Sequence, residues 1–234
     1  MISRNNQTRE KLLADFSSGA LNYGLVISNS ALSSFAGYEE ELLRWNDKIN
    51  LVSLKMPQEL WSRHFLDSLS AAPFVLNRGG TLLDLGAGGG FPGLPLKIVF
   101  PELKIFLLES SRKKSSFLNH AIRLLGLPQA TVINERVESI LMDNKYRHGF
   151  DAVISRAAFK LPELVRYSAY LLAANGMMIA MKGGKVLDGE LAQAQIIAPA
   201  VGLAFLSCHD TKNERTGERR IILIFKKYPP VDSP

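Results

Sequence analysis

The sequence predicts an α/β fold in which helices cover both faces of a mostly parallel sheet and a helical extension precedes the sheet. Three observations support this prediction. Only helical patterns occur before residue 79, strand and helix patterns alternate after Gly80, and no helical pattern separates the last two strands. Alternating strands and helices are typical of parallel sheets, because a parallel crossover needs a long connection.

The N-terminal region is predicted to contain two helices. One passes through the acidic run Glu39–Glu41, and the other follows Pro57. Apolar residues recur in both at helical spacing. They are Leu32, Phe35, Leu42, Leu43 and Trp45 in the first helix, and Leu60, Phe65, Leu66 and Leu69 in the second. We therefore expect a helical extension over residues 1–78, a core domain over 79–228, and a short flexible tail over 229–234.

The region after Gly80 contains seven short β-rich runs. We expect strands at residues 81–85, 104–109, 130–134, 151–155, 177–182, 201–208 and 219–226. Apolar helical segments fill most of the gaps, at residues 92–100, 112–126, 162–174 and 187–198. Only His209–Glu218, with the turn Thr216–Gly217, separates the last two strands, so these should pair antiparallel. The expected sheet is seven-stranded and mostly parallel, with an antiparallel final strand.

Composition limits the classes of protein to which the chain can belong. Its 234 residues, 47% of them hydrophobic, suit one full-sized domain with a small extension. The single cysteine, Cys208, excludes an intramolecular disulfide and a cysteine-rich metal site, and no metal site is predicted. The polar N-terminus and the absence of a membrane-spanning apolar run predict a cytoplasmic protein. The net charge of +6 permits a polyanionic partner such as nucleic acid, although many basic proteins bind none.

The run LLDLGAGGGFPGLPL at residues 82–96 places an acid and a cluster of glycines at the end of the first strand. Open α/β sheets bind ligands outside the carboxyl ends of their strands, so Asp84, Gly86, Gly88 and Gly90 mark the expected site. A dinucleotide fingerprint would have a third glycine where this chain has Phe91, and Asp84 would repel a pyrophosphate. S-adenosylmethionine has no phosphate and carries an ammonium and a sulfonium. The loop therefore favours S-adenosylmethionine.

Three further strand ends would complete a nucleoside site. Glu109 ends the second strand and can accept both ribose hydroxyls, or it is a solvated acid that caps the helix beginning near Ser111. Val137 and Glu138 follow the third strand and would lie over the adenine, or they simply begin a helix. Arg156 ends the fourth strand, where it could hold the cofactor carboxylate or a substrate phosphate. The alternative for Arg156 is a surface arginine that pairs with a nearby acid.

The fourth strand also bears on the chemistry of the methyl acceptor. Amino-group methyltransferases typically carry an Asp/Asn-Pro-Pro-aromatic run at this strand end, whereas this chain has SRAAF at residues 155–159. Methylation of a cytosine carbon needs a cysteine nucleophile, and Cys208 lies in a late strand, away from the expected site. Both kinds of acceptor are therefore disfavoured.

Seven short motifs carry a resemblance to a known family. They are WNDKINLVS (45–53), RHFLDS (63–68), LLDLGAGGGFPGLPL (82–96), LLES (107–110), ERVES (135–139), ISRA (154–157) and MKGG (181–184). Together they closely resemble the bacterial small-subunit ribosomal RNA methyltransferase G family, also called glucose-inhibited division protein B. The resemblance runs from about Trp45 to Lys226, and the combination of RHxxDS with the FPGxPL loop is specific. Residues 87–90 are AGGG where many members carry Thr or Ser and Pro, which should leave the cofactor unchanged.

This resemblance implies a Rossmann-like class I S-adenosylmethionine-dependent methyltransferase fold. It also implies methyl transfer from S-adenosylmethionine to N7 of a guanine in the decoding-region loop of 16S rRNA, guanine 527 in standard rRNA numbering. The expected partner is 16S rRNA or the 30S ribosomal subunit, with no membrane, and the chain is expected to act as a monomer. The resemblance marks Gly86, Phe91, Val137, Glu138 and Arg156 as cofactor-contacting positions. With the strand-end residues, the expected cofactor set is Asp84, Gly86, Gly88, Gly90, Phe91, Glu109, Val137, Glu138 and Arg156.

The motif RHFLDS has both a functional and a structural interpretation. In the functional interpretation, substrate is bound by Lys182 and by the residues that match the family's N-terminal motif, Arg63, His64, Asp67 and Ser68. In the structural interpretation, Arg63 and Asp67 pair on a helix surface, His64 is a packing residue, and Ser68 bonds back to the preceding turn. No residue is assigned as catalytic, and Arg156 and His64 are the candidates.

Two other functions remain open at the level of sequence. The same cofactor pocket would serve a methyltransferase that acts on a small molecule or a protein. It would also serve a regulator that binds the cofactor without catalysis. Transfer of label from tritiated S-adenosylmethionine to rRNA, 30S particles or extract protein would separate these possibilities.

Overall fold

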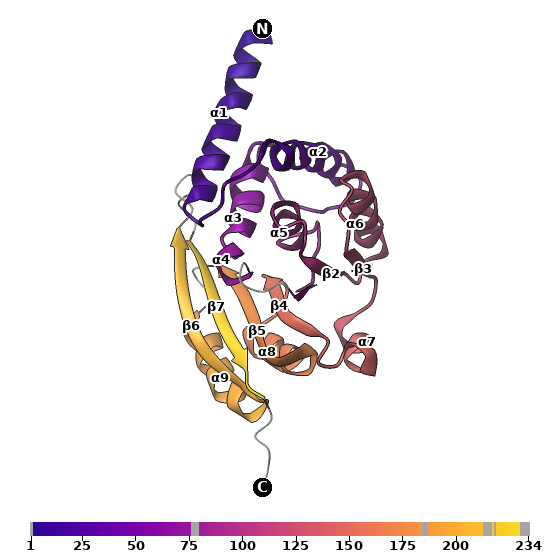
Figure 1. Ribbon diagram of the computed structural model, residues 1–234, viewed down its shortest axis with the longest axis vertical. Coiled ribbons are helices and arrows are strands. Elements are labelled where there is room, and N and C mark those ends of the chain that lie inside the picture. The colour runs from indigo at the N-terminus through magenta and orange to yellow at the C-terminus, as the bar shows by residue number, and fades with distance from the viewer. Residues whose placement is uncertain (1, 76–79, 184–186, 213–216, 218, 230–234) are drawn as a thin grey trace.

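The computed structural model describes residues 2–75, 80–183, 187–212, 217 and 219–229. Figure 1 shows a single twisted sheet with helices on both faces and the N-terminal helices gathered on one side. The expected boundary near residue 78, Thr216 of the expected turn and residues 230–234 of the expected tail lie outside the described residues. The division into three parts stays a prediction.

The described residues form a seven-stranded sheet in the order β3-β2-β1-β4-β5-β7-β6. Strands β1 to β5 pair in parallel, and β7 is antiparallel to both of its neighbours. The strands are β1 Thr81–Leu85, β2 Lys104–Leu108, β3 Ala130–Ile133, β4 Phe150–Arg156, β5 Leu172–Gly183, β6 Leu203–Lys212 and β7 Arg219–Lys227. This confirms the expected sheet. The order reverses between β1 and β4, the kind of position where open α/β sheets bind ligands.

Helices cover the two faces of the sheet in separate groups. One face packs in a single hydrophobic cluster with the N-terminal helices, α5 and α6, and the other face packs with α7, α8 and α9. The helices after β1 are α5 Gly93–Val99, α6 Arg112–Leu124, α7 Val137–Leu141, the 3-10 helix η2 Asn144–Tyr146, α8 Leu161–Leu171 and α9 Leu187–Ala200. Strand residues alternate between the clusters, with Leu82 in the first and Leu83 in the second.

The N-terminal region is helical, as its periodicity predicts. It contains α1 Ile2–Leu21, α2 Asn29–Asn46, the π-helix η1 Leu60–Leu66, α3 Asp67–Leu69 and α4 Ala72–Val75. Helix α2 begins where the Ser28 hydroxyl accepts a hydrogen bond from the Ala31 amide at 3.1 Å. It buries Ala31, Phe35, Tyr38 and Leu42 at helical spacing. No described helix is long and apolar enough to cross a membrane.

Three details differ from the sequence expectation. Helix α1, over Ile2–Leu21, was not among the two helices expected in the N-terminal region. The helix after Pro57 is a π-helix over its first seven residues, and π-helical turns occur frequently at functional sites. Strand β5 begins at Leu172 rather than at residue 177, and α8 ends at Leu171. The early start is possible because the pairing with β4 shifts, so that Phe150 faces Leu172 while Ala152 faces Met177.

Candidate functional site

The glycine loop between β1 and α5 begins with a residue that must be glycine. Gly86 has φ +78°, and a Cβ there would lie 2.6 Å from the Ala158 Cβ. The amides of Gly86 and Ala87 both donate to the Leu108 carbonyl, at 3.0 and 2.9 Å. The loop is thereby fixed against the end of β2 and lies in contact with the segment that follows β4.

Glu109 joins the glycine loop to the helix that follows β2. One carboxylate oxygen accepts from the Gly88 amide at 2.9 Å, and the other accepts from the Ser111 amide at 2.8 Å. Ser111 itself caps α6 by accepting from the Lys114 amide. Glu109 is 8% exposed and borders a pocket, so it can meet a ligand while it holds the loop. Its expected contact with a ribose stays a prediction.

A pocket of about 280 Å³ opens at the carboxyl ends of β1 to β4. It lies at the edge of the sheet where the sequence predicts the cofactor site. Val137 and Glu138 form the first turn of α7, which confirms the helix start, and both also line the pocket. Their expected contact with an adenine stays a prediction. The residues that line the pocket are Gly86, Leu108, Glu109, Ser110, Glu135, Arg136, Val137, Glu138 and Phe159.

Asp84 lies beneath the loop and does not line this pocket. It is fully buried, and one carboxylate oxygen accepts from the Gly93 amide at 2.8 Å, at the start of α5. Within the described residues the other oxygen, Oδ1, has no hydrogen-bond partner. Burial raises the pKa of Asp84 to about 7, with the Gly93 hydrogen bond and Arg156 acting against the rise. The predicted role of Asp84 toward a cationic ligand stays a prediction.

Gly90 and Phe91 connect the loop to the N-terminal helices. A Cβ on Gly90, which has φ +97°, would lie 2.5 Å from the Tyr38 hydroxyl. That hydroxyl donates to the Gly89 carbonyl, and the Tyr38 ring stacks on Phe91 with ring centres 5.6 Å apart. Burial raises the pKa of Tyr38 well above its ordinary value, so it remains a donor. In the sequence, only its place on an amphipathic helix distinguishes Tyr38.

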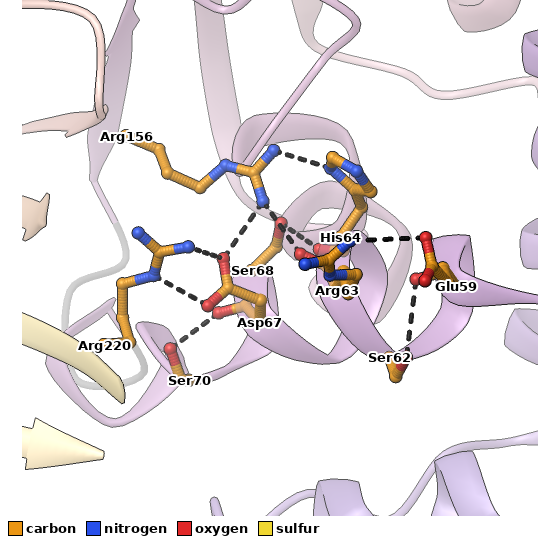
Figure 2. A network of polar contacts seen from close by, with 9 residues as sticks. All are labelled: Glu59, Ser62, Arg63, His64, Asp67, Ser68, Ser70, Arg156 and Arg220. Carbon is orange, nitrogen blue, oxygen red and sulfur yellow. Dashed lines mark hydrogen bonds and ion pairs between the residues drawn. The ribbon is translucent and has the colours of Figure 1, made fainter. Parts of the chain in front are cut away.

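Figure 2 shows a second cluster of polar residues, which surrounds Asp67 and Arg156. Arg156 places its guanidinium 5.0 Å from the centre of the Phe91 ring. It donates to Asp67 at 3.0 Å and to Nδ1 of His64 at 2.9 Å. Arg220, from β7, donates to both oxygens of Asp67 at 2.7 and 2.9 Å. Arg156 is therefore paired with an acid, as the structural alternative holds, but inside the molecule rather than on its surface.

The motif RHFLDS supplies much of this cluster. Arg63 donates to Glu59 at 3.3 Å, whereas Asp67 contacts the two distant arginines. The Ser68 hydroxyl donates to the His64 carbonyl at 2.6 Å, so the expected bond back to the preceding turn is confirmed. Burial, with the nearby Arg156, lowers the pKa of His64 to about 4, and the imidazole is neutral at pH 7.

Lys182, on β5, contacts the segment that follows β4. Its ammonium donates to the Phe159 carbonyl at 2.5 Å and to Glu190 at 3.2 Å. The side chain is buried, and Phe159 lines the pocket. Lys182 therefore fixes one wall of the pocket, and its expected contact with substrate stays a prediction.

The structure thus gathers the expected residues into two groups. Gly86, Glu109, Val137 and Glu138 share the pocket, and Gly88 adjoins it through its bond to Glu109. A second group surrounds Arg156. Phe91 of the loop lies against the Arg156 guanidinium, and Gly90, next to it, lies close to the Tyr38 hydroxyl. Sequence reasoning missed Tyr38, Phe159 and Arg220 as members of the site. Within the described residues, no cluster of three or more His, Cys, Asp or Glu could hold a metal ion.

The fold and the glycine-loop site define a class of protein. The 16S rRNA (adenine(1408)-N(1))-methyltransferase from Catenulisporales acidiphilia has a TM-score of 0.54, with 13% identity over 70% of this chain and 93% of that chain. M. jannaschii TYW2 in complex with AdoMet has a TM-score of 0.51, with 17% identity over 63% of this chain and 69% of that chain. The chain has the Rossmann-like fold of class I S-adenosylmethionine-dependent methyltransferases.

Sequence comparison identifies the family within this class. Residues 31–217 match the model of rRNA small subunit methyltransferase G. The Ribosomal RNA small subunit methyltransferase G of Syntrophus aciditrophicus is 40% identical over 213 residues, 91% of this chain and 88% of that protein. The protein of the same name from Roseiflexus castenholzii is 36% identical over 210 residues, 90% of this chain and 89% of that protein. The chain belongs to the rRNA small subunit methyltransferase G family, which confirms the resemblance carried by the motifs.

Proposed function

We propose that this methyltransferase transfers the methyl group of S-adenosylmethionine to N7 of guanine 527 in the decoding-region loop of 16S rRNA. The observation that carries the proposal is a family match over residues 31–217 that includes every residue lining the pocket beside the glycine loop. The family supports a small-subunit rRNA substrate, and the AdoMet-bound neighbour of similar fold supports the cofactor.

The residues around the pocket fit S-adenosylmethionine. Glu109 offers carboxylate oxygens to ribose hydroxyls, and Val137 and Phe159 offer apolar surface to an adenine ring. The unpartnered Oδ1 of buried Asp84 favours a positive charge nearby. When bound, the cofactor would supply a methyl group activated by a positively charged sulfur. We propose that Arg156, Phe91 and the glycines complete its binding site.

The proposed reaction needs no general base. Guanine N7 has a lone pair in the plane of the ring and carries no proton, so no side chain has to remove one. His64 agrees with this chemistry, because its Nδ1 accepts from Arg156 and its pKa of about 4 makes it a weak base. The task of the protein is to hold the two reactants in line, which can lower a barrier by about 7–11 kcal/mol in favourable cases.

The substrate side of the site is proposed to lie along RHFLDS and near Lys182. Arg63 and His64 are partly exposed and suited to direct contact with RNA. The other three residues are buried and would act indirectly, through their neighbours: Asp67, Ser68 and Lys182. We propose that the enzyme acts as a monomer in the cytoplasm on 16S rRNA or the 30S subunit. The net charge of +6 supports a polyanionic partner.

A methyl-transfer assay tests the proposal directly. The protein is incubated with tritiated S-adenosylmethionine and one acceptor: 30S particles lacking the modification, naked 16S rRNA, or extract protein. We expect label in rRNA, and nuclease digestion with mass spectrometry should identify N7-methylguanosine at a single position. Label in extract protein alone, or in a different base, would contradict the proposal.

A further inference from the structure

Asp67 receives hydrogen bonds from two arginines that are far apart in the sequence (Figure 2). Arg220 uses Nε and one terminal nitrogen to contact both carboxylate oxygens, at 2.7 and 2.9 Å. Arg156 contacts only Oδ2, at 3.0 Å. The three side chains are 9%, 21% and 12% exposed for Asp67, Arg220 and Arg156. They form a partly buried triad with two cations and one anion.

The two contacts differ in what they fix. A two-point bond between a guanidinium and a carboxylate sets the plane of the carboxylate, because both groups are planar and the donors are parallel. The single bond from Arg156 sets no plane. Arg220 therefore orients the Asp67 carboxylate, and Asp67 in turn directs its Oδ2 toward Arg156.

A contribution to folding stability does not explain this triad well. Burial lowers the pKa of Arg156, with Asp67 acting against the fall, which shows that its charge is held at a cost. Buried arrangements of two arginines and one acid often contribute less to stability than apolar residues of the same size. His64, neutral at pH 7, adds an acceptor to Arg156 but no compensating charge.

The triad holds Arg156 against the glycine loop. Arg156 is the last residue of β4, and its guanidinium lies over the ring of Phe91, which follows Gly90. Tyr38 and His64 pack on the same ring. Arg156 therefore links the carboxyl end of β4 to the loop beside which the cofactor is proposed to bind.

We propose that Arg220 is a positioning residue for methyl transfer, which acts through Asp67 to hold Arg156 in its cofactor-binding orientation. The inference rests on the proposed function, since it assumes that Arg156 contacts S-adenosylmethionine. If so, β7 contributes to the site although β5 separates it from β4 in the sheet. The side chain that acts is separated from its carboxylate partner by 153 residues of sequence.

A double-mutant cycle on cofactor affinity tests this proposal. The variants are Arg220→Gln, Arg156→Gln and the double variant, with the dissociation constant of S-adenosylmethionine measured by calorimetry. We expect Arg220→Gln alone to weaken binding about tenfold, and to add less than twofold when Arg156 is already Gln, because effects that share one route are not additive. Arg220→Lys keeps the charge but not the two-point bond, and should recover only part of the loss.

Matched controls separate positioning from general damage. Arg219 lies next to Arg220 on β7 and pairs with exposed Asp210, so Arg219→Gln should bind S-adenosylmethionine as the wild type does. Equal losses in the Arg220 and Arg219 variants, or multiplied losses in the double variant, would overturn the inference. If the wild type binds S-adenosylmethionine but does not methylate rRNA, the proposed function fails while the cycle still decides the role of Arg220. If the wild type methylates rRNA and the cycle is additive, only this inference fails.

Discussion

Replacing Asp84 by asparagine is expected to make the stability of the ligand-free protein less dependent on pH. Asp84 is fully buried beneath the glycine loop, and its pKa rises from the ordinary value of 3.8 to about 7, chiefly through burial. In the folded protein the carboxyl keeps its proton between about pH 4 and 7, where the unfolded chain releases it. The folded state then binds more protons than the unfolded state, so the free energy of unfolding falls as the pH rises through this window.

The size of the effect follows from the shift in pKa. A rise in pKa from 3.8 to about 7 changes the free energy of unfolding by about 4 kcal/mol between pH values well below and well above both pKa values. Of this total, about 2–3 kcal/mol of the free energy of unfolding is lost between pH 5 and pH 8. Asparagine has no such titration and keeps an oxygen that can accept from the Gly93 amide, a contact of 2.8 Å in the wild type.

Urea unfolding at pH 5 and pH 8, followed by circular dichroism without ligand, measures this difference. Relative to the wild type, Asp84→Asn should gain about 2–3 kcal/mol in free energy of unfolding on going from pH 5 to pH 8. Asp151→Asn is a matched control, because exposed Asp151 also accepts from a backbone amide, that of Thr81, at 2.8 Å. If wild type and Asp84→Asn change in parallel with pH, the reasoning about the buried carboxyl is wrong.

Three other predictions concern ligand, acceptor and partner. Glu109→Gln removes a charged acceptor from the Gly88 and Ser111 amides and from the proposed ribose contact, so S-adenosylmethionine should bind about 10- to 100-fold more weakly, a loss of about 1.5–3 kcal/mol. Calorimetry checks this, and unchanged affinity would remove Glu109 from the site. Single-turnover methyl transfer by saturated enzyme should vary little between pH 6 and 9, because the pKa of His64 is about 4 and N7 carries no proton. A rate that rises tenfold per pH unit and is abolished in His64→Ala would show a general base. Binding to rRNA should weaken with salt, with a slope of about −0.7 in log affinity against log salt for each phosphate contacted. Filter binding between 50 and 300 mM KCl, on the order of physiological ionic strength, measures that slope, and a flat response would point to another class of substrate.

The sequence predicted the pocket because the rules for parallel sheets are local. Gly86, Glu109, Val137 and Glu138 each follow a strand that alternation and flanking helices make visible. Carboxyl ends of parallel strands meet at one edge, so residues that are far apart in the chain converge there without any knowledge of side-chain packing. Four predicted residues therefore line one pocket.

The same rules could not assign Asp84 to a face of its strand. Leu83 and Leu85 pack with α7 to α9, whereas Leu82 packs with the N-terminal helices, so Asp84 points toward the latter. Alternation shows that Asp84 and Leu82 share a face. It does not show which face carries the ligand, and that depends on where the loop folds after the strand.

The polar partners of Arg156 could not be predicted from the sequence, for a different reason. Arg220 lies on a hairpin strand rich in charge, and nothing in its neighbours distinguishes it from Arg219, which is exposed and pairs with Asp210. Which of two adjacent arginines turns inward depends on the face of β7 that each occupies and on the position of Asp67. Both follow from tertiary packing rather than from a local pattern.

The N-terminal helices contribute residues that contact the glycine loop of the candidate site. The Tyr38 hydroxyl from α2 donates to the Gly89 carbonyl, so this helix fixes the conformation of the loop. His64 and Asp67, from the next helical segment, hold Arg156 over Phe91. The glycines give the loop little stiffness of their own, since glycine has the greatest conformational freedom in the unfolded chain. Rigidity must therefore come from contacts outside the loop. The end of β2 supplies some of these through the Leu108 carbonyl and Glu109, and the N-terminal helices supply others through Tyr38 and, by way of Arg156, through Phe91.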